Sequence, residues 1–124
     1  MTWRYEQSSG SFYHNDTLIT VGYSGLGEHK NKPEDQYLKG LGPLPVGKYH
    51  IGPLYDSPNV GPNALPLEAL PGTDTKGRGD FKIHGDSIRT PGSASHGCVI
   101  LPVRYRLDIG HSEDRTLEVF CLKS

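Results

Sequence analysis

The sequence predicts a single mainly-β domain over residues 1–124, a sandwich or barrel with long loops and little helix. Glycine and proline (16 and 10 residues) make up about a fifth of the chain and interrupt it every six to twelve residues, which suits short strands and turns. The apolar segments between them are short and are alternating or rich in β-branched residues. A chain of 124 residues holds one compact core and has little room for a second.

The first half of the chain contains three expected strand regions, and a long loop separates the second from the third. Residues 3–12 alternate around a Ser-Ser-Gly turn. Residues 17–21 have the β-branched sequence TLITV and end at a glycine. Residues 22–47 are rich in glycine and proline and predict loops, after which residues 48–51 give another short strand.

The second half contains three more expected strands and one short helix. Residues 63–70 are the helical candidate, which Pro66 limits to a turn or two because proline cannot donate a backbone hydrogen bond. Residues 81–84, 99–101 and 116–122 are apolar or β-branched and predict strands. Because no internal repeat or heptad pattern occurs, we expect these elements to form one irregular β domain.

Charge and hydropathy exclude several classes of partner. The formal net charge is -1, which argues against nucleic acid or an anionic membrane as the main partner, since both need clustered basic charge. No run of 18 apolar residues exists, so we expect no transmembrane helix. The N-terminus lacks a basic region followed by an apolar stretch, which predicts synthesis in the cytoplasm without a Sec-type signal peptide.

Reactive side chains concentrate between residues 81 and 106. Alternation along the expected strand places Phe81 and Ile83 on one face and His84 and Asp86 on the other. With the apolar pair in the core, His84 projects from a strand end into a polar cleft. Asp86 follows two residues later, and we expect it to orient the imidazole.

A cysteine follows His84 at a distance that a loop can close. Cys98 comes fourteen positions later, after a run of small residues and before an apolar strand. A thiol becomes a strong nucleophile when a base accepts its proton, and backbone N–H groups around Gly97 and Cys98 can form an oxyanion hole. Each signal alone is weak, because a cysteine before an apolar run is commonly a core thiol. Together they predict a site for acyl transfer.

The combination resembles a known family. Residues 83–86 (IHGD) followed by residues 95–98 (SHGC) are similar to the signature of the L,D-transpeptidase catalytic domain, and residues 42–49 (GPLPVGKY) resemble the strand that precedes the site in that family. Similarity to a short branch, the peptidoglycan-cleaving L,D-transpeptidase and carboxypeptidase effectors of bacterial type VI secretion, is carried by residues 3–10, 22–25 and 77–86. The resemblance covers roughly residues 3–106.

The resemblance implies an L,D-transpeptidase-like fold and assigns roles residue by residue. Cys98 would be the acylated nucleophile and His84 the general base. Ser95, His96 and Gly97 would shape the pocket and the oxyanion hole. The substrate would be a peptidoglycan stem tetrapeptide, cleaved between its diamino acid and its terminal D-Ala, with water or a D-amino acid as acceptor and without a metal or other cofactor.

The sequence departs from the family pattern in two places. The spacer between His84 and Ser95 is shorter than in housekeeping L,D-transpeptidases, which favours hydrolysis or exchange of one terminal residue over cross-linking of two stems. The basic or amide residue usual just after the cysteine motif is absent. In residues 103–108 charged and apolar side chains alternate, and we expect Arg104 from this segment, together with Arg78, to bind the substrate's carboxylate groups.

The same resemblance implies where the protein acts and what it meets there. It would be secreted by a dedicated machine and would act in the periplasm of a target cell. Secretion-system components and a cognate immunity protein would be its partners, because a periplasmic toxin needs an antidote in the cell that makes it.

Three other interpretations of the reactive residues stay open. His84, His96 and Cys98 could form a zinc site, although no fourth ligand lies at a usual spacing. A papain-like cell-wall amidase or peptidase needs a histidine after the cysteine, and here that is His111. A non-catalytic wall-binding module is the third.

The second cysteine, Cys121, has a structural interpretation. It shares a predicted strand face with Leu117 and Val119, so we expect a buried thiol. A disulfide between Cys121 and Cys98 would abolish the proposed chemistry.

Overall fold

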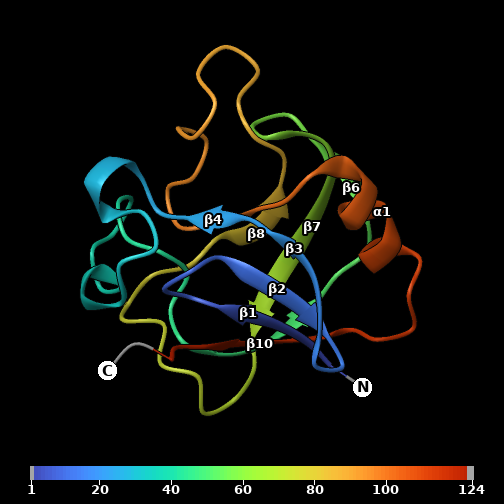
Figure 1. The fold of residues 1–124 in the computed structure, drawn as a ribbon, viewed down its shortest axis with the longest axis horizontal. Helices are drawn as coiled ribbons and strands as arrows, with labels where there is room; N and C mark the ends of the chain where they lie inside the picture. The colour runs from blue at the N-terminus through green and yellow to red at the C-terminus, as the bar shows by residue number, and fades with distance from the viewer. Residues whose placement is uncertain (1, 123–124) are drawn as a thin grey trace.

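A computed structural model describes residues 2–122, and within that range ten strands join into one sheet that nearly closes into a barrel (Figure 1). Strands hold 36% of the residues and helices 12%, which confirms the mainly-β class. No helix in the described part of the chain is long and apolar enough to span a membrane.

The sequence order of the elements differs from their order in the sheet. The strands are β1 (Trp3–Glu6), β2 (Ser11–His14), β3 (Thr17–Val21), β4 (Tyr23–Ser24), β5 (Gly47–Ile51), β6 (Tyr55–Ser57), β7 (Gly61–Ala69), β8 (Phe81–His84), β9 (Val99–Ile100) and β10 (Thr116–Phe120). Two short 3-10 helices, η1 (Gly27–His29) and η2 (Pro33–Asp35), follow β4, and α1 (Val103–Gly110) follows β9. The sheet order is β3-β2-β1-β10-β5-β7-β8-β9-β4, with β6 paired to β7.

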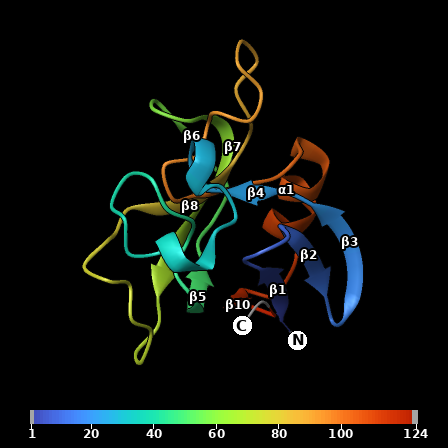
Figure 2. The ribbon, with the colours of Figure 1, turned by 60° about the vertical axis from the view of Figure 1, so that its left-hand side comes forward.

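Two strand pairs are parallel and the others are antiparallel. β1 lies beside β10, so the first and last strands are neighbours (Figures 1 and 2). β8 lies beside β9, and the connection between them forms the orange loop at the top of Figure 1. A parallel pair cannot be joined by a tight hairpin, so a longer connection between β8 and β9 is required.

The core fills the inside of this curved sheet. Tyr5, Phe12, Tyr49, Ile83 and Leu117 come from five different strands, and each is fully buried. They alternate with less buried neighbours, as the sequence pattern predicts for half-buried strands. Their burial fixes which face of each strand points inward, and thereby which side chains remain for a site.

The helix expected at residues 63–70 is wrong, because residues 63–69 belong to the long strand β7. Leu65 and Leu67 are buried on the core side, and β7 pairs with β5 on one side and β8 on the other. Pro66 does not prevent the strand, because its carbonyl oxygen accepts the Gly52 N–H at 2.8 Å. Core burial and pairing on both sides decide the conformation here over the helical preference of the local sequence.

The alternation of charged and apolar residues over 103–108 does not mark a strand, because these residues belong to helix α1. Arg106 and Ile109, three positions apart, are its buried residues. The helix begins after Pro102, and proline is well tolerated at a helix start. The charged residues of this segment therefore do not share one face as they would in a strand.

Candidate active site

The parallel pairing of β8 and β9 brings the predicted nucleophile and base together. His84 is the last residue of β8 and pairs with Ile100, and Cys98 lies directly before β9. The backbone N–H of Lys82 donates a hydrogen bond to the sulfur of Cys98. Because paired residues in a sheet share a face, Lys82, His84 and Cys98 lie on the same side, away from the core face of β8.

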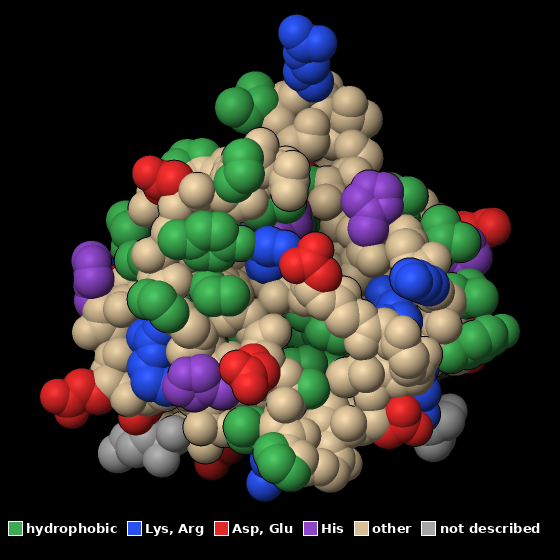
Figure 3. All heavy atoms as spheres, turned by 180° about the vertical axis from the view of Figure 1, so that it is seen from behind, with side chains coloured by type: hydrophobic (Ala, Val, Ile, Leu, Met, Phe, Trp, Pro, Cys, Tyr) green, Lys and Arg blue, Asp and Glu red, His purple; other side chains and the backbone are tan. Residues whose placement is uncertain are grey.

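These side chains line one cavity of about 370 Å³. Its walls come from residues in the segments 39–40, 59–60, 78–84 and 94–98. Figure 3 shows the side of the molecule opposite to Figure 1, where histidine, basic and acidic side chains gather around a hollow near its centre. Within the cavity His84 is only 3% exposed and Cys98 is partly exposed, so the pair is shielded from bulk water but reachable.

A larger cavity of about 550 Å³ has Gly85 in its wall. It is lined by Asp86, Arg89 and Arg106, among others, and by neither the thiol nor the imidazole. The smaller cavity is therefore the candidate active site, because it alone of the two combines a nucleophile with a base.

A backbone carbonyl orients the imidazole of His84. Its Nδ1 lies 2.9 Å from the carbonyl oxygen of Gly85. Because a carbonyl oxygen only accepts hydrogen bonds, Nδ1 carries the proton of the neutral ring, which leaves Nε2 as an acceptor. Burial lowers the pKa of His84, and the positive charges of Arg106 and Lys82 lower it further.

Asp86 was expected to orient His84, but its carboxylate instead forms hydrogen bonds that hold the loop after β8. Its carboxylate accepts the Tyr23 hydroxyl at 2.6 Å and the N–H groups of Ser87 and Gly92 at 2.8 and 3.0 Å. Although burial opposes it, these hydrogen bonds lower the pKa of Asp86. The Tyr23 oxygen in turn accepts the Ala94 N–H at 3.0 Å, so Asp86 holds the loop close to the nucleophile's turn.

The fully buried hydroxyl of Ser95 fixes the turn before Cys98. It accepts the N–H groups of Gly25 at 2.9 Å and Gly97 at 3.2 Å, and it donates to the Cys98 carbonyl at 2.6 Å. Since the Gly97 N–H already binds Ser95, it is not free to form the oxyanion hole that the resemblance implies. The backbone N–H of Cys98 is the remaining candidate donor beside the sulfur.

Gly97 cannot be replaced by another residue without strain. Its φ is +134°, and a Cβ on it would lie 2.3 Å from Nη2 of Arg78. Both the backbone conformation and the close approach therefore require glycine.

The thiol and the imidazole are both neutral in the free protein at neutral pH. Burial raises the pKa of the Cys98 thiol, although the backbone hydrogen bond from Lys82 and the charge of that lysine oppose the effect. Because burial lowers the pKa of His84 at the same time, the site disfavours a thiolate–imidazolium pair in the free protein. An attack by the Cys98 sulfur would therefore need a proton transfer from the thiol at that moment.

Arg78 was expected to bind substrate, but its guanidinium is occupied by the protein. Nη1 donates to the carbonyl oxygens of Gln36 at 2.5 Å and Pro43 at 2.8 Å. Nη2 donates to those of Gly42 at 2.9 Å and His96 at 3.3 Å. Arg78 lines the cavity, but its terminal donors connect the loop over residues 36–43 to the turn before the nucleophile.

The structure does not bring Arg104 to the cavity. It is exposed on α1, where its guanidinium lies 5.5 Å from the centre of the Tyr105 ring. His96 does line the cavity, at an exposed rim position, with Nδ1 3.1 Å from the Gly40 carbonyl. Sequence reasoning also missed Lys39 and Asn59, which line the cavity from distant loops without any motif that marks them.

Cys121 is not the buried strand residue that the sequence predicts. β10 ends at Phe120, and Cys121 lies partly exposed beyond it. It forms no disulfide with Cys98. The periodicity fails here because the strand stops two residues before the end of the expected strand over residues 116–122.

The zinc and papain-like interpretations can be compared with the geometry. Although His84, His96 and Cys98 all line the cavity, no group of three or more His, Cys, Asp or Glu side chains within residues 2–122 is placed to hold a metal ion. His111 caps the end of α1 and does not line the cavity.

Fold and site together define a mainly-β protein with a cysteine and a histidine at the paired ends of two parallel strands. A family model, the Tlde1 domain, matches residues 19–109, about three quarters of the chain, and includes both residues. The chain belongs to this family, which is an L,D-transpeptidase-like family of type VI secretion effectors. No curated protein matches the chain significantly.

Proposed function

We propose that this protein removes or exchanges the terminal D-Ala of peptidoglycan stem tetrapeptides through an acyl-enzyme on Cys98. One observation carries the proposal: His84 and Cys98, fourteen residues apart, line the same small cavity in a member of the Tlde1 family. The protein would thus be an L,D-carboxypeptidase or an L,D-transpeptidase that exchanges a single residue.

The first half of the reaction forms the thioester. Sγ of Cys98 attacks the carbonyl carbon of the diamino acid, while Nε2 of His84 accepts the thiol proton. The backbone N–H of Cys98 stabilises the developing oxyanion. The carbon–nitrogen bond then breaks, the His84 proton passes to the leaving nitrogen, and D-Ala departs as a free amino acid.

The second half releases the acyl group. Water or the amine of a D-amino acid attacks the thioester carbonyl, and His84 takes a proton from the attacking group. The carbon–sulfur bond breaks and the proton returns to the thiolate. Water yields a tripeptide stem, and a D-amino acid yields an exchanged tetrapeptide.

The neutral state of His84 and Cys98 is compatible with this order of reaction steps. Since burial disfavours both the thiolate and the imidazolium, neither charge is stored in the free protein. The proton moves only when a carbonyl carbon is present to receive the electron pair of sulfur. The Gly85 carbonyl holds the correct tautomer of His84 throughout.

The family supports a proposal for the biological setting. As a type VI secretion effector, the protein would be made in the cytoplasm, delivered by the secretion machine and active in the periplasm of a target cell. A cognate immunity protein would protect the producing cell.

Defined muropeptides test the proposed reaction. Purified protein is incubated with tetrapeptide muropeptides, and the products and the intact protein are weighed by mass spectrometry. We expect tripeptide or exchanged products and an adduct on Cys98. Cys98→Ala should remove both, and the control variant Cys121→Ala should keep both. Folded wild-type protein that forms neither product nor adduct would refute the proposal.

A further inference from the structure

Among the cations that line the candidate cavity within the described residues, one has side-chain donors that no protein group uses. Three Lys and Arg side chains line the cavity: Lys39, Arg78 and Lys82. Nζ of Lys82 lies 2.7 Å from the Asp80 carboxylate, and both terminal nitrogens of Arg78 donate to backbone carbonyls. In the described part of the chain Lys39 makes no side-chain hydrogen bond or ion pair, which leaves its ammonium for a ligand.

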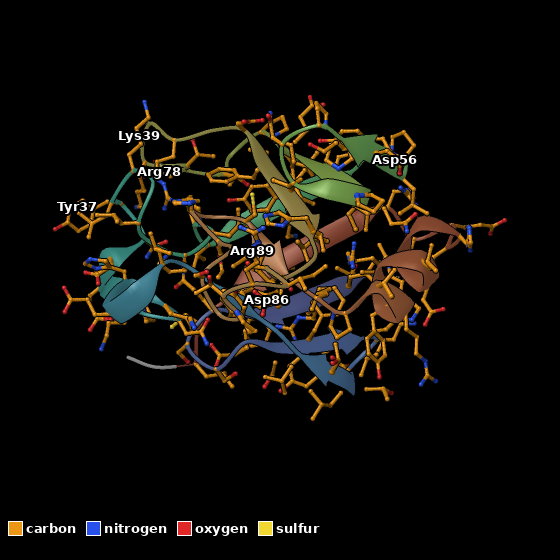
Figure 4. All side chains as sticks on the ribbon, turned by 90° about the horizontal axis from the view of Figure 1, so that it is seen from above. Tyr37, Lys39, Asp56, Arg78, Asp86 and Arg89 are labelled. Atoms are coloured by element: carbon orange, nitrogen blue, oxygen red, sulfur yellow. The ribbon has the colours of Figure 1, made fainter. Side chains whose placement is uncertain are left out.

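The backbone that carries Lys39 is held in place on both sides. Arg78 binds the carbonyl oxygens of Gln36, Gly42 and Pro43, and so anchors the two ends of the loop over residues 36–43. Near its tip, the Gly40 carbonyl lies 3.1 Å from Nδ1 of His96. Figure 4 shows Lys39 and Arg78 on the same side of the molecule. Lys39 is thus an exposed side chain on a positioned loop at the cavity wall.

The chemistry of a stem tetrapeptide supplies an anion beside the scissile bond. Its terminal residue ends in a free carboxylate that only the α-carbon separates from the scissile nitrogen. A cavity of about 370 Å³ that holds the thiol must therefore also receive this carboxylate. A carboxylate taken from water without a charged partner is costly to bury, and a lysine ammonium is a compact charge that offsets that cost.

We propose that Lys39 binds the free terminal carboxylate of the substrate and thereby selects stem peptides with an uncapped C-terminal residue. This inference rests on the proposed function. It assigns to Lys39 the role that the sequence suggested for Arg104. It also explains why the site would act on a terminal residue and not within a peptide or cross-link.

Paired substrates and a matched variant test the selectivity. Turnover is measured on a tetrapeptide with a free terminal carboxylate and on the same peptide with a terminal carboxamide, with wild-type protein, Lys39→Gln and the control Lys32→Gln. Lys32 is exposed and lies outside the cavity. We expect wild type and Lys32→Gln to prefer the free acid by about tenfold in kcat/KM, the typical loss for one charge-assisted hydrogen bond. Lys39→Gln should lose this preference through a higher KM for the acid, with the amide unchanged.

Binding measured without turnover separates the two proposals. In the Cys98→Ala background, calorimetry with the free-acid peptide should show Kd about tenfold weaker when Lys39 is also changed to Gln. If wild type cleaves the acid and Lys39→Gln keeps both the preference and the affinity, the inference is wrong and the proposed function stands. An effect equal on acid and amide also overturns it. Absence of both turnover and binding overturns both.

Discussion

Replacing Gly97 by alanine should destabilise the protein and disable the site from a position that carries no reactive group. Gly97 lies directly before Cys98, with φ at +134°. A Cβ there would lie 2.3 Å from Nη2 of Arg78 and 3.5 Å from Cε1 of Phe81. Because Nη2 is held between two carbonyl oxygens, those of Gly42 and His96, it cannot move without losing hydrogen bonds.

Two costs add in the Gly97→Ala variant. An alanine at this φ costs about 1–3 kcal/mol in backbone strain. Displacing Nη2 loses at least one hydrogen bond from a buried charged group, which costs about 1.5–3 kcal/mol. The free energy of unfolding should therefore fall by about 2.5–6 kcal/mol, a large part of the 5–15 kcal/mol typical of such domains.

Urea denaturation measures this loss. Trp3 is the single tryptophan of the chain, is 4% exposed and stacks on His14, so its fluorescence reports unfolding. Gly79→Ala is the matched control, because Gly79 lines the same cavity but has no positive φ and nothing within 4 Å of an added Cβ. We expect the control to change stability by less than about 1 kcal/mol. A Gly97→Ala variant as stable as this control, with Cys98 still acylated, would show that the turn does not need glycine.

Four further predictions concern the base, the pH profile, the loop and the compartment. His84→Ala should lower the rate of Cys98 acylation by about 10²–10⁴-fold, whereas His96→Ala should retain measurable acylation, and the reverse order would exchange their roles. Because His84 must be neutral to accept the thiol proton and burial lowers its pKa, kcat/KM should fall only below about pH 6.5; an acid limb centred above that value contradicts the shift. Asp86→Asn should weaken the loop closure, so that the Gly92 amide exchanges hydrogen faster while global unfolding shifts by less than about 1 kcal/mol; unchanged exchange would show that the carboxylate does not hold the loop. Expression in the cytoplasm should be tolerated and export to the periplasm should cause swelling or lysis, and toxicity confined to the cytoplasm would argue against a cell-wall substrate.

The strands could be predicted where alternation and β-branched residues agree with burial. Residues 17–21, 48–51 and 81–84 all form strands at or within one residue of the expected bounds. β7 and α1 could not be predicted in the same way. Around Pro66, pairing with strands on both sides outweighs the helix-like composition. Around Arg106, the packing of one helix face outweighs the alternation of apolar and charged residues.

The motifs located the candidate reactive residues but not the residues around them. A strand end followed by a glycine, and a Ser-His-Gly-Cys turn, are local patterns, so His84, Ser95, Gly97 and Cys98 are all found at the candidate site. The roles expected of Asp86, Arg78 and Arg104 depended on partners elsewhere in the chain. In the structure, Asp86 holds the loop after β8 and Arg78 donates to four backbone carbonyls. Arg104 is exposed on α1.

By itself, then, the sequence determined the mainly-β class and the pair His84 and Cys98, because backbone periodicity and a short turn motif are encoded within a few neighbouring residues. Only the tertiary structure decided which cation remains unpaired beside that pair. Lys39 is separated from Cys98 by 59 positions, and it reaches the cavity because Arg78 anchors its loop. Which charged group is available to a ligand depends on which side-chain donors the protein already uses, and that is a property of the folded contacts.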